Sequence, residues 1–305
     1  MELNKIQSAG LSIFSNLSLS ILKLVVGIFS GSMAIIAESA HSAFDLLASF
    51  IAYFSVRVSD RPADQEHPYG HTKIENISGL LEAILIFGVS IWIVSEAIEK
   101  IRKGTELSYI PLGIGVMLVS LLANIIVSRL LYRVAKRTGS IALEADAAHL
   151  YSDVLTSGGV ILALGVIYLG ERFWGLKLYI VDPIFSIFIA VWILGIAYRL
   201  TLKSYPALID GRANPEMEAE IAREIREFCA DQCQFHKLRT RQAGSAVHID
   251  FHLQFVPDTH IDIAHQISHQ LKERLKKNFK GSEVIIHLEP FEQEEEPVNK
   301  KSSKE

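Results

Sequence analysis

Six long apolar runs occupy most of the first 205 residues, and they constrain the fold more than any other feature of the sequence. They lie at residues 8–30, 33–56, 77–99, 108–132, 142–169 and 179–201. About 20 apolar residues are enough for a helix to cross the hydrocarbon core of a bilayer. Hydrophobic residues make up 50% of the chain and are concentrated in these runs. We therefore expect an α-helical membrane protein with six transmembrane helices.

Basic residues in the short loops predict the orientation of these helices, because Lys and Arg accumulate on the cytoplasmic side. A cytoplasmic N-terminus places the basic loop residues within 57–73 and 129–137 on that side. An even number of spans then returns the chain to the cytoplasm. We expect a multi-pass protein of the cell inner membrane, embedded in the lipid bilayer, with cytoplasmic N- and C-termini. Lys23, inside the first run, is expected to extend its ammonium group to a membrane interface.

The sequence changes character after residue 208, where charged residues reach the density of a soluble domain. Apolar spacing predicts helices at 214–229 and 260–277, and alternation predicts strands at 236–242, 246–256 and 282–288. The order αββαβ indicates a small cytoplasmic α+β domain. We expect a transmembrane transport domain over 1–208, this cytoplasmic domain over 209–290, and a disordered polar tail over 291–305.

A pattern of acid-x-x-His-x-x-x-Asp occurs twice inside the apolar runs. The first copy contains Glu38, His41 and Asp45, and the second contains Asp146, His149 and Asp153. Residues three or four positions apart share one face of a helix, so each copy can direct an imidazole and a carboxylate toward one point. Ionisable groups inside a bilayer are costly and are typical of functional sites. Two such helices facing each other predict a four-ligand metal site.

The ligand chemistry favours zinc as the ion at this site. Two carboxylates and two neutral imidazoles carry two negative charges, which a divalent cation neutralises in a medium of low dielectric constant. Four nitrogen and oxygen ligands suit tetrahedral zinc better than magnesium or calcium. Without metal the site is expected to take up protons, which links metal binding to proton binding. Glu38 and Asp146 are expected near opposite ends of the path, as solvated acids or as relay groups.

Other observations exclude several function classes. The net charge of −4 gives no indication of nucleic-acid binding. No phosphate-binding loop of the Gly-x-x-x-x-Gly-Lys-[Ser/Thr] type is present, so the sequence does not indicate ATP-driven transport through such a loop. Cys229 and Cys233 do not form a disulfide framework, and we expect them to be reduced, with one buried and one exposed. Together with His236 they are an alternative site for zinc or copper.

Taken together, the two His-x-x-x-Asp motifs and the domain order resemble the cation diffusion facilitator family of proton-coupled zinc exporters. The resemblance covers nearly the whole chain, including a metallochaperone-like cytoplasmic domain. It implies export of zinc from the cytosol in exchange for protons, by a homodimer that associates through this domain. Zinc is then the transported and regulatory ion, with no prosthetic group. The implied transport-site residues are His41, Asp45, His149 and Asp153.

The resemblance also implies metal sites outside the membrane. The loop between the second and third runs contains the matching residues Asp64, His67 and His71. In the cytoplasmic domain, residues two positions apart in a strand lie on the same face of the sheet. His252 therefore shares a face with other polar residues of its strand, and His287 shares a face with Glu289 in the last strand. The positions that match the family pattern there are His236, His252, His265, His287 and Glu289. Lys73 and Asp210 resemble a salt bridge that ties the membrane helices together.

Two alternatives remain open at the sequence level. The same four ligands would suit an exporter of manganese, iron(II) or cobalt. A membrane-bound metalloenzyme would need an open metal position and a nearby general base. The sequence contains no His-Glu-x-x-His motif, and four protein ligands would close the site, so we do not expect an enzyme.

Overall fold

The computed structural model describes residues 4–30, 33–103, 111–175, 180–230, 232–279 and 281–291. The chain forms two compact units, one containing residues 1–210 with 243–245 and the other containing residues 211–242 with 246–305. Except for Phe291, the tail expected over 291–305 lies outside the described residues.

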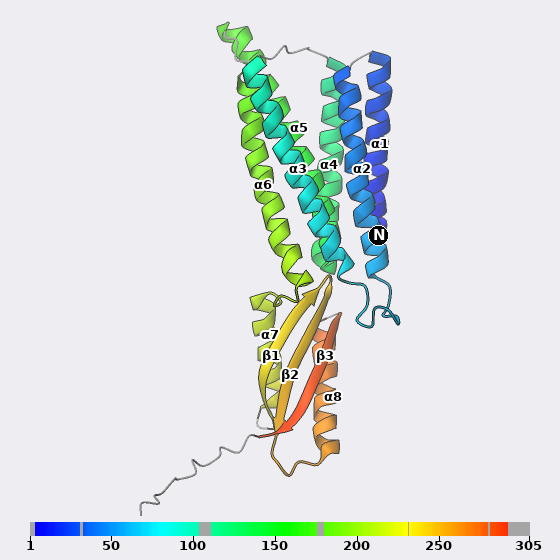
Figure 1. Ribbon diagram of the computed structural model, residues 1–305, viewed down its shortest axis with the longest axis vertical. Helices are drawn as coiled ribbons and strands as arrows, with labels where there is room; N and C mark the ends of the chain where they lie inside the picture. The colour runs from blue at the N-terminus through cyan, green and yellow to red at the C-terminus, as the bar shows by residue number, and fades with distance from the viewer. Residues whose placement is uncertain are drawn as a thin grey trace, which may run out of the picture. The chain divides into compact units, whose positions relative to one another are not determined.

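The first unit is a bundle of long helices (Figure 1). The helices are α1 (Lys5–Ser30), α2 (Met33–Ser59), α3 (Ile74–Lys103), α4 (Pro111–Thr138), α5 (Ile141–Trp174) and α6 (Val181–Leu208). Each predicted apolar run largely coincides with one of them. Most of the helices extend beyond the run at one or both ends, because the flanking charged residues continue the helix without adding to the apolar segment.

Helix packing in this unit is based on pairs, with α1 against α2, α3 against α6, and α4 against α5. The α3–α6 contact is close at Gly79, where an added Cβ would lie 2.5 Å from the Ser204 Oγ. Helix α5 also contacts α2, α3 and α6, so it lies centrally in the bundle. This central position brings the second acid-His-Asp motif next to the helices that surround it.

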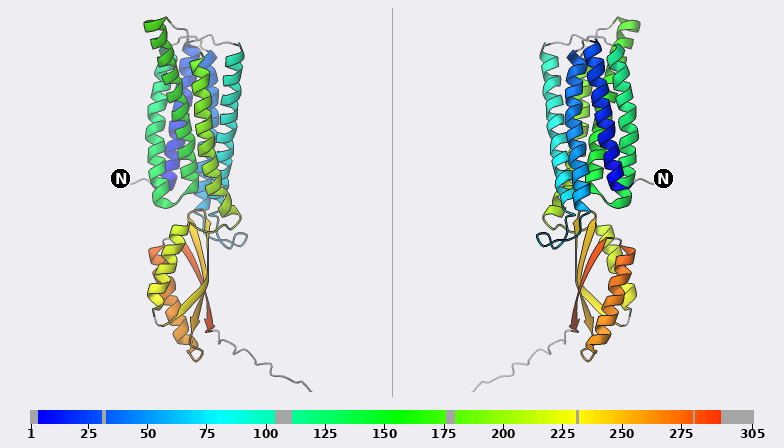
Figure 2. Two further views of the ribbon diagram at one scale, coloured as in Figure 1. Left: turned by 90° about the vertical axis from the view of Figure 1, so that its left-hand side faces the viewer. Right: turned by 90° about the vertical axis from the view of Figure 1, so that its right-hand side faces the viewer.

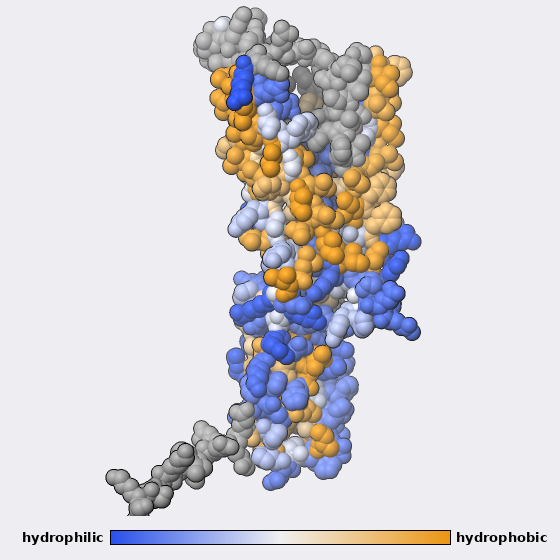
Figure 3. All heavy atoms as spheres, in the orientation of Figure 1, coloured by the Kyte–Doolittle hydropathy of each residue, from blue (hydrophilic) through white to orange (hydrophobic). Residues whose placement is uncertain are grey.

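Four helices in the described part of the chain are long and apolar enough to cross a membrane by length and composition alone. They are α1, α3, α4 and α6, with the searched spans Lys5–Val26, Ile74–Glu99, Met117–Thr138 and Pro183–Leu208. On the face shown in Figure 3, hydrophobic side chains cover much of the coloured part of the first unit, whereas the coloured part of the second unit is mainly hydrophilic. The first unit is therefore a helical membrane domain.

The second unit contains a three-stranded sheet with two helices on one of its faces (Figure 2). Its elements are α7 (Pro215–Cys229), β1 (Gln234–Ala243), β2 (Ala246–Phe255), α8 (Ile261–Asn278) and β3 (Ser282–Pro290). The strand order is β1-β2-β3, and β2 pairs in parallel with β3 so that His252 lies opposite His287. The predicted αββαβ order is confirmed.

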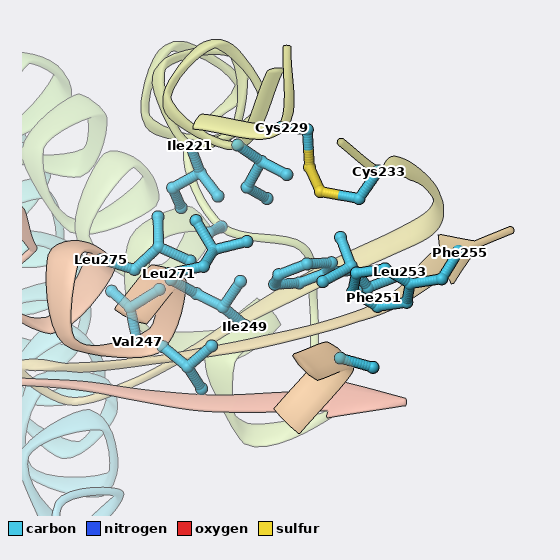
Figure 4. Close-up of a cluster of buried hydrophobic side chains, with 14 residues drawn as sticks. Ile221, Cys229, Cys233, Val247, Ile249, Phe251, Leu253, Phe255, Leu271 and Leu275 are labelled. Atoms are coloured by element: carbon cyan, nitrogen blue, oxygen red, sulfur yellow. A yellow bond between two sulfur atoms is a disulfide. The ribbon is translucent and has the colours of Figure 1, made fainter. Parts of the chain in front are cut away.

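Alternation along β2 separates an apolar face from a polar face. Ile249, Phe251 and Leu253 are at most 1% exposed and pack against α7 and α8 (Figure 4). Because successive strand residues point to opposite faces, His252 points away from this core. The helices leave that polar face of the sheet uncovered.

The cysteines differ from the sequence prediction. Cys229 and Cys233 are joined by a disulfide, and both are buried in the core of the second unit (Figure 4). The expectation of reduced cysteines, one buried and one exposed, is therefore wrong for this structure. The physical reason is that α7 ends at Cys229 and Ala230 has a positive φ of 40°, so the chain turns back. The two Cα atoms lie 4.9 Å apart, within the range for a disulfide.

Candidate metal centres

The two predicted intramembrane motifs come together in the structure. Asp45 of α2 lies beside His149 and Asp153 of α5, and one ligand atom from each residue lies within 4.8 Å of the others. The His149 Nε2 is 3.3 Å from the Asp45 Oδ1. Asp45 and His149 are 7% and 5% exposed. Imidazole nitrogen and carboxylate oxygen at this spacing form a donor set suited to zinc. The fourth predicted ligand, His41, lies in α2, and its side chain is outside the described residues.

A small polar cavity adjoins these ligands. Its volume is about 30 Å³, and Asp45 and Asp153 line it together with Lys23, Ser42 and Asn124. This volume suits one water molecule or one ion. Lys23 is only 6% exposed and donates to the Ser42 Oγ over 2.7 Å. The expectation that Lys23 extends to a membrane interface is therefore wrong, because polar groups inside the bundle give its ammonium group a partner.

Asp146 lies in a buried hydrogen-bond network and not in solvent. The Ser49 Oγ donates to the Asp146 Oδ1 over 3.1 Å, and the Asn16 Nδ2 donates to the same Ser49 oxygen over 2.8 Å. Ser12 and Ser49 share a further hydrogen bond of 3.0 Å. The network joins α1, α2 and α5, so it fixes the helices that carry the metal ligands. The side chain of Glu38 lies outside the described residues.

Glu82 of α3 is a buried acid that the sequence analysis missed. It is fully buried, accepts a hydrogen bond from the Ser78 Oγ over 3.3 Å, and interacts electrostatically with Asp146 and His149. Its second carboxylate oxygen has no hydrogen-bond partner among the described residues. The sequence does contain a signal for this residue, because Glu82 is an acid inside the apolar run at 77–99. It was overlooked because α3 carries no His at helical spacing from Glu82.

The loop between α2 and α3 brings together Asp64, His67 and His71, as predicted. The Asp64 Oδ1 lies 3.3 Å from the His67 Nδ1, and the Asp64 Oδ2 lies 3.3 Å from the His71 Nε2. The two imidazole centroids are 4.4 Å apart. His71 is 8% exposed, and its Nδ1 has no hydrogen-bond partner among the described residues. One carboxylate and two imidazoles therefore converge in this loop.

Backbone hydrogen bonds keep the loop carboxylate ionised. The N–H groups of His67 and Glu66 donate to the Asp64 Oδ1 over 2.7 Å and 3.0 Å. The hydrogen bond from the His67 backbone is the largest cause lowering the pKa of the Asp64 carboxyl below its ordinary value. A carboxylate that stays charged near two imidazoles is well suited to bind a divalent cation. Close to this loop, the Lys73 Nζ lies 2.8 Å from the Asp210 Oδ1, which confirms the predicted salt bridge.

A third cluster lies on the polar face of the sheet. His236, His252 and Glu289 come from three different strands and offer ligand atoms within 4.8 Å of one another. The Glu289 Oε2 is 2.9 Å from the His252 Nδ1, and the other carboxylate oxygen contacts the His236 Nε2. The hydrogen bond with His252 is the main cause lowering the pKa of Glu289. Glu289 thus lies between the two imidazoles.

The two remaining predicted residues of this set are in different positions. The His287 ring lies 4.7 Å from the His252 ring, so His287 borders the cluster. His265 lies exposed on α8, where its ring is 6.3 Å from that of His269. Helix α8 covers the opposite face of the sheet, so one chain does not bring His265 to the other four residues.

Comparisons with known proteins agree with this architecture. The family model described as the cation efflux transmembrane domain matches residues 10–209, and the model described as the cation efflux protein cytoplasmic domain matches residues 213–291. The cation-efflux pump FieF of Salmonella arizonae is 32% identical over 274 residues, covering 90% of this chain and 89% of FieF.

Two further proteins are similar over different lengths. The Synechocystis protein sll1263, described as an uncharacterized transporter, is 31% identical over 284 residues, covering 93% of this chain and 90% of that protein. A solved structure of the Zn form of CzrB is 31% identical, with a TM-score of 0.26, and covers 26% of this chain and 91% of that chain. On the family models and the relatives of matching length, this chain belongs to the cation diffusion facilitator family of cation efflux transporters.

Proposed function

We propose that the protein exports zinc from the cytosol in exchange for protons. The observation that carries the proposal is the buried group of Asp45, His149 and Asp153 between α2 and α5. His41 completes the set as a fourth ligand, one helical turn from Asp45 in α2. Two carboxylates and two imidazoles then neutralise a divalent cation, and loss of the cation favours proton uptake by the same groups. The protein acts as a transporter and not as an enzyme.

The proposed organisation follows the sequence prediction. Six helices, including α2 and α5, cross the inner membrane over residues 1–208, and both termini lie in the cytoplasm. Residues 209–290 form a cytoplasmic domain that binds zinc and dimerises, followed by a polar tail. Support comes from the family model for a cytoplasmic domain and from the uncovered polar face of the sheet.

Two regulatory zinc sites are part of the proposal. The loop site consists of Asp64, His67 and His71. The domain site consists of His236, His252, His265, His287 and Glu289, and His265 reaches it only from a second copy of the chain or after a rearrangement. The clustering of three donors at each position supports this assignment.

Reconstitution into proteoliposomes tests the proposed reaction. Uptake of zinc, cadmium, manganese and iron(II) is measured with an imposed pH gradient and without one. We expect zinc uptake to depend on an outward proton gradient and to be lost in Asp153→Asn. Equal zinc flux with and without the gradient would contradict proton coupling. Faster gradient-driven uptake of manganese or iron(II) than of zinc would instead favour an exporter of that metal through the same site.

A further inference from the structure

A large groove lies on the side of α5 that faces away from the metal ligands. Its volume is about 690 Å³, and α4, α5 and α6 all contribute to its walls. Ala147, Ala148 and Tyr151 of α5 form one wall. His149 and Asp153 point to the opposite side of the same helix, since a residue advances about 100° along an α-helix. The groove is therefore separate from the transport site.

The charged side chains in this groove favour an anion. Arg129, Arg199 and Lys203 line it together with one acid, Glu144, so three cationic groups and one carboxylate leave an excess of two positive charges. Glu144 forms an ion pair with Lys203. The Arg199 Nε donates to the carbonyl of Gly195 over 3.3 Å. A site with this charge repels a divalent metal ion, so the groove does not suit zinc entry.

The two arginines have the capacity to bind a phosphate group. Neither Arg129 nor Arg199 forms an ion pair with a carboxylate in the described part of the chain, and both are exposed. A guanidinium group donates in a planar, two-pronged geometry that matches phosphate oxygens. Arg199 and Lys203 are four residues apart on α6 and thus share one face. The cationic end of the groove is consistent with a phosphate-binding site.

Aromatic and aliphatic side chains line the groove beyond these cations. Trp192 lies seven residues before Arg199 on α6, which is about 10 Å along the helix axis. Trp192, Tyr132 and Tyr151 are 49%, 45% and 44% exposed. Trp and Tyr are typical of the level where lipid headgroups meet acyl chains. Arg129 and Arg199 lie near the C-terminal ends of the apolar runs at 108–132 and 179–201, and the helices α4 and α6 continue beyond these runs to Thr138 and Leu208.

We propose that this groove binds an anionic phospholipid. Arg129 and Arg199 hold the lipid phosphate, and the start of an acyl chain lies along Trp192 and Ile196. Basic pockets between transmembrane helices are suited to anionic headgroups, and a free phosphate would leave the aromatic part of the groove unused. The bound lipid bridges α4 and α6 across α5, the helix that carries His149 and Asp153.

Native mass spectrometry of the purified full-length protein tests this site. The protein is titrated with phosphatidylglycerol and with phosphatidylcholine of the same acyl chains. Removal of one cation in Arg129→Gln or Arg199→Gln is expected to weaken phosphatidylglycerol binding about fivefold, and the double variant about 25-fold. Phosphatidylcholine carries the same phosphate but also a choline cation, so it is expected to bind the native chain more weakly and to lose less affinity in each variant than phosphatidylglycerol does. Arg199→Lys keeps the charge and is expected to retain most of the affinity.

Arg133→Gln is the matched control, because Arg133 is an exposed basic residue of α4 that does not line the groove. It is expected to bind phosphatidylglycerol as the native chain does. The unfolding temperature of every variant is measured in detergent without added lipid and is expected to stay native, which shows that the bundle is folded. Unchanged phosphatidylglycerol affinity in the double variant, or an equal loss in Arg133→Gln, would overturn the proposal. Displacement of the lipid by an equal concentration of inorganic phosphate would also overturn it.

Discussion

The His149 Nε2 lies 3.3 Å from the Asp45 Oδ1, although the two residues are 104 positions apart in the chain. This contact joins the two His-x-x-x-Asp motifs across the α2–α5 interface. The adjoining cavity of about 30 Å³ has room for one ion or water next to the two carboxylates Asp45 and Asp153. Residues from the two copies of the sequence motif therefore form one candidate metal site.

The buried hydrogen-bond network around Ser49 and Asp146 is expected to stabilise the bundle. Ser49→Ala removes the donor to the Asp146 Oδ1 and leaves a buried carboxylate oxygen without that hydrogen bond. We expect a loss of about 1–3 kcal/mol in stability, measured as a lower unfolding temperature of the detergent-solubilised protein. Ser90→Ala is the matched control, since the buried Ser90 hydroxyl donates to the Ile86 carbonyl of its own helix and to no other group in the described part of the chain. Equal destabilisation by the two variants would contradict the role of the network.

The loop cluster predicts a separable zinc site. Asp64→Asn removes the carboxylate between His67 and His71 and is expected to abolish zinc binding at the loop. Equilibrium dialysis should then detect fewer zinc ions per chain, whereas flux through the membrane site continues. Glu66→Gln is the control, because Glu66 is an exposed acid of the same loop outside the cluster. The assignment fails if Asp64→Asn and the native chain bind the same number of zinc ions.

The sheet cluster depends on Glu289, which contacts both His236 and His252. Glu289→Gln keeps the shape of the side chain but removes its charge. Mutating a residue that only hydrogen-bonds to a metal ligand typically lowers metal affinity by about tenfold or more. Glu289 is itself a proposed ligand, so we expect zinc affinity at this site to fall at least about tenfold. Zinc affinity is measured by calorimetric titration of the full-length chain carrying Asp153→Asn and Asp64→Asn. These two substitutions disable the membrane and loop sites, so the heat that remains comes from the sheet cluster. Glu283→Gln, on the same strand and the same face, should leave the affinity unchanged.

An ion pair at the start of α7 predicts how stability in the second unit depends on pH. Hydrogen bonds from Arg212 and Thr240 reach Glu218, and Arg212 is the main cause that lowers the pKa of this carboxyl. A folded-state pKa below the unfolded value contributes stability above about pH 4.5, and this contribution disappears as the pH falls through the folded-state pKa.

Hydrogen exchange in the full-length protein measures this effect. At pH 7 we expect Glu218→Gln to lower protection of α7 and β1 by about 0.5–1 kcal/mol. The difference from the native chain should shrink toward zero in acid, where the native carboxyl is also neutral. A difference that persists unchanged at pH 3 would show that Glu218 acts through packing and not through its charge. Glu220→Gln, an exposed acid of the same helix with a weaker contact at 3.6 Å, serves as the comparison.

The sequence predicted where the helices and strands lie better than it predicted which side chains are buried and what they contact. Apolar runs located the long helices because run length reflects the thickness of the membrane, and alternation located β2 because one face of a half-covered sheet is buried. The repeated motif identified His149, Asp45 and Asp153. Periodicity defines the face on which a residue lies but not which helix packs against that face, so the burial of Lys23 and the proximity of Glu82 to the site were not predicted.

The remaining differences have local physical causes. The Cys229–Cys233 bond depends on where α7 ends and on the positive φ of Ala230, and the spacing of the cysteines does not reveal either. His265 shares the residue type of the sheet cluster but lies on a helix that covers the opposite face. Residue type therefore predicted candidate ligands, whereas topology decided which of them converge within one chain.

Zinc flux through single-site variants in proteoliposomes tests the central claim most directly. Asp45→Asn and Asp153→Asn are compared with Asp64→Asn, which changes the loop cluster outside the membrane. Because each membrane variant removes a charged ligand from the buried site, we expect zinc flux to fall by about 100-fold or more, while Asp64→Asn keeps most of the native flux. Native flux in Asp153→Asn would contradict the assignment of the α2–α5 site as the transport site.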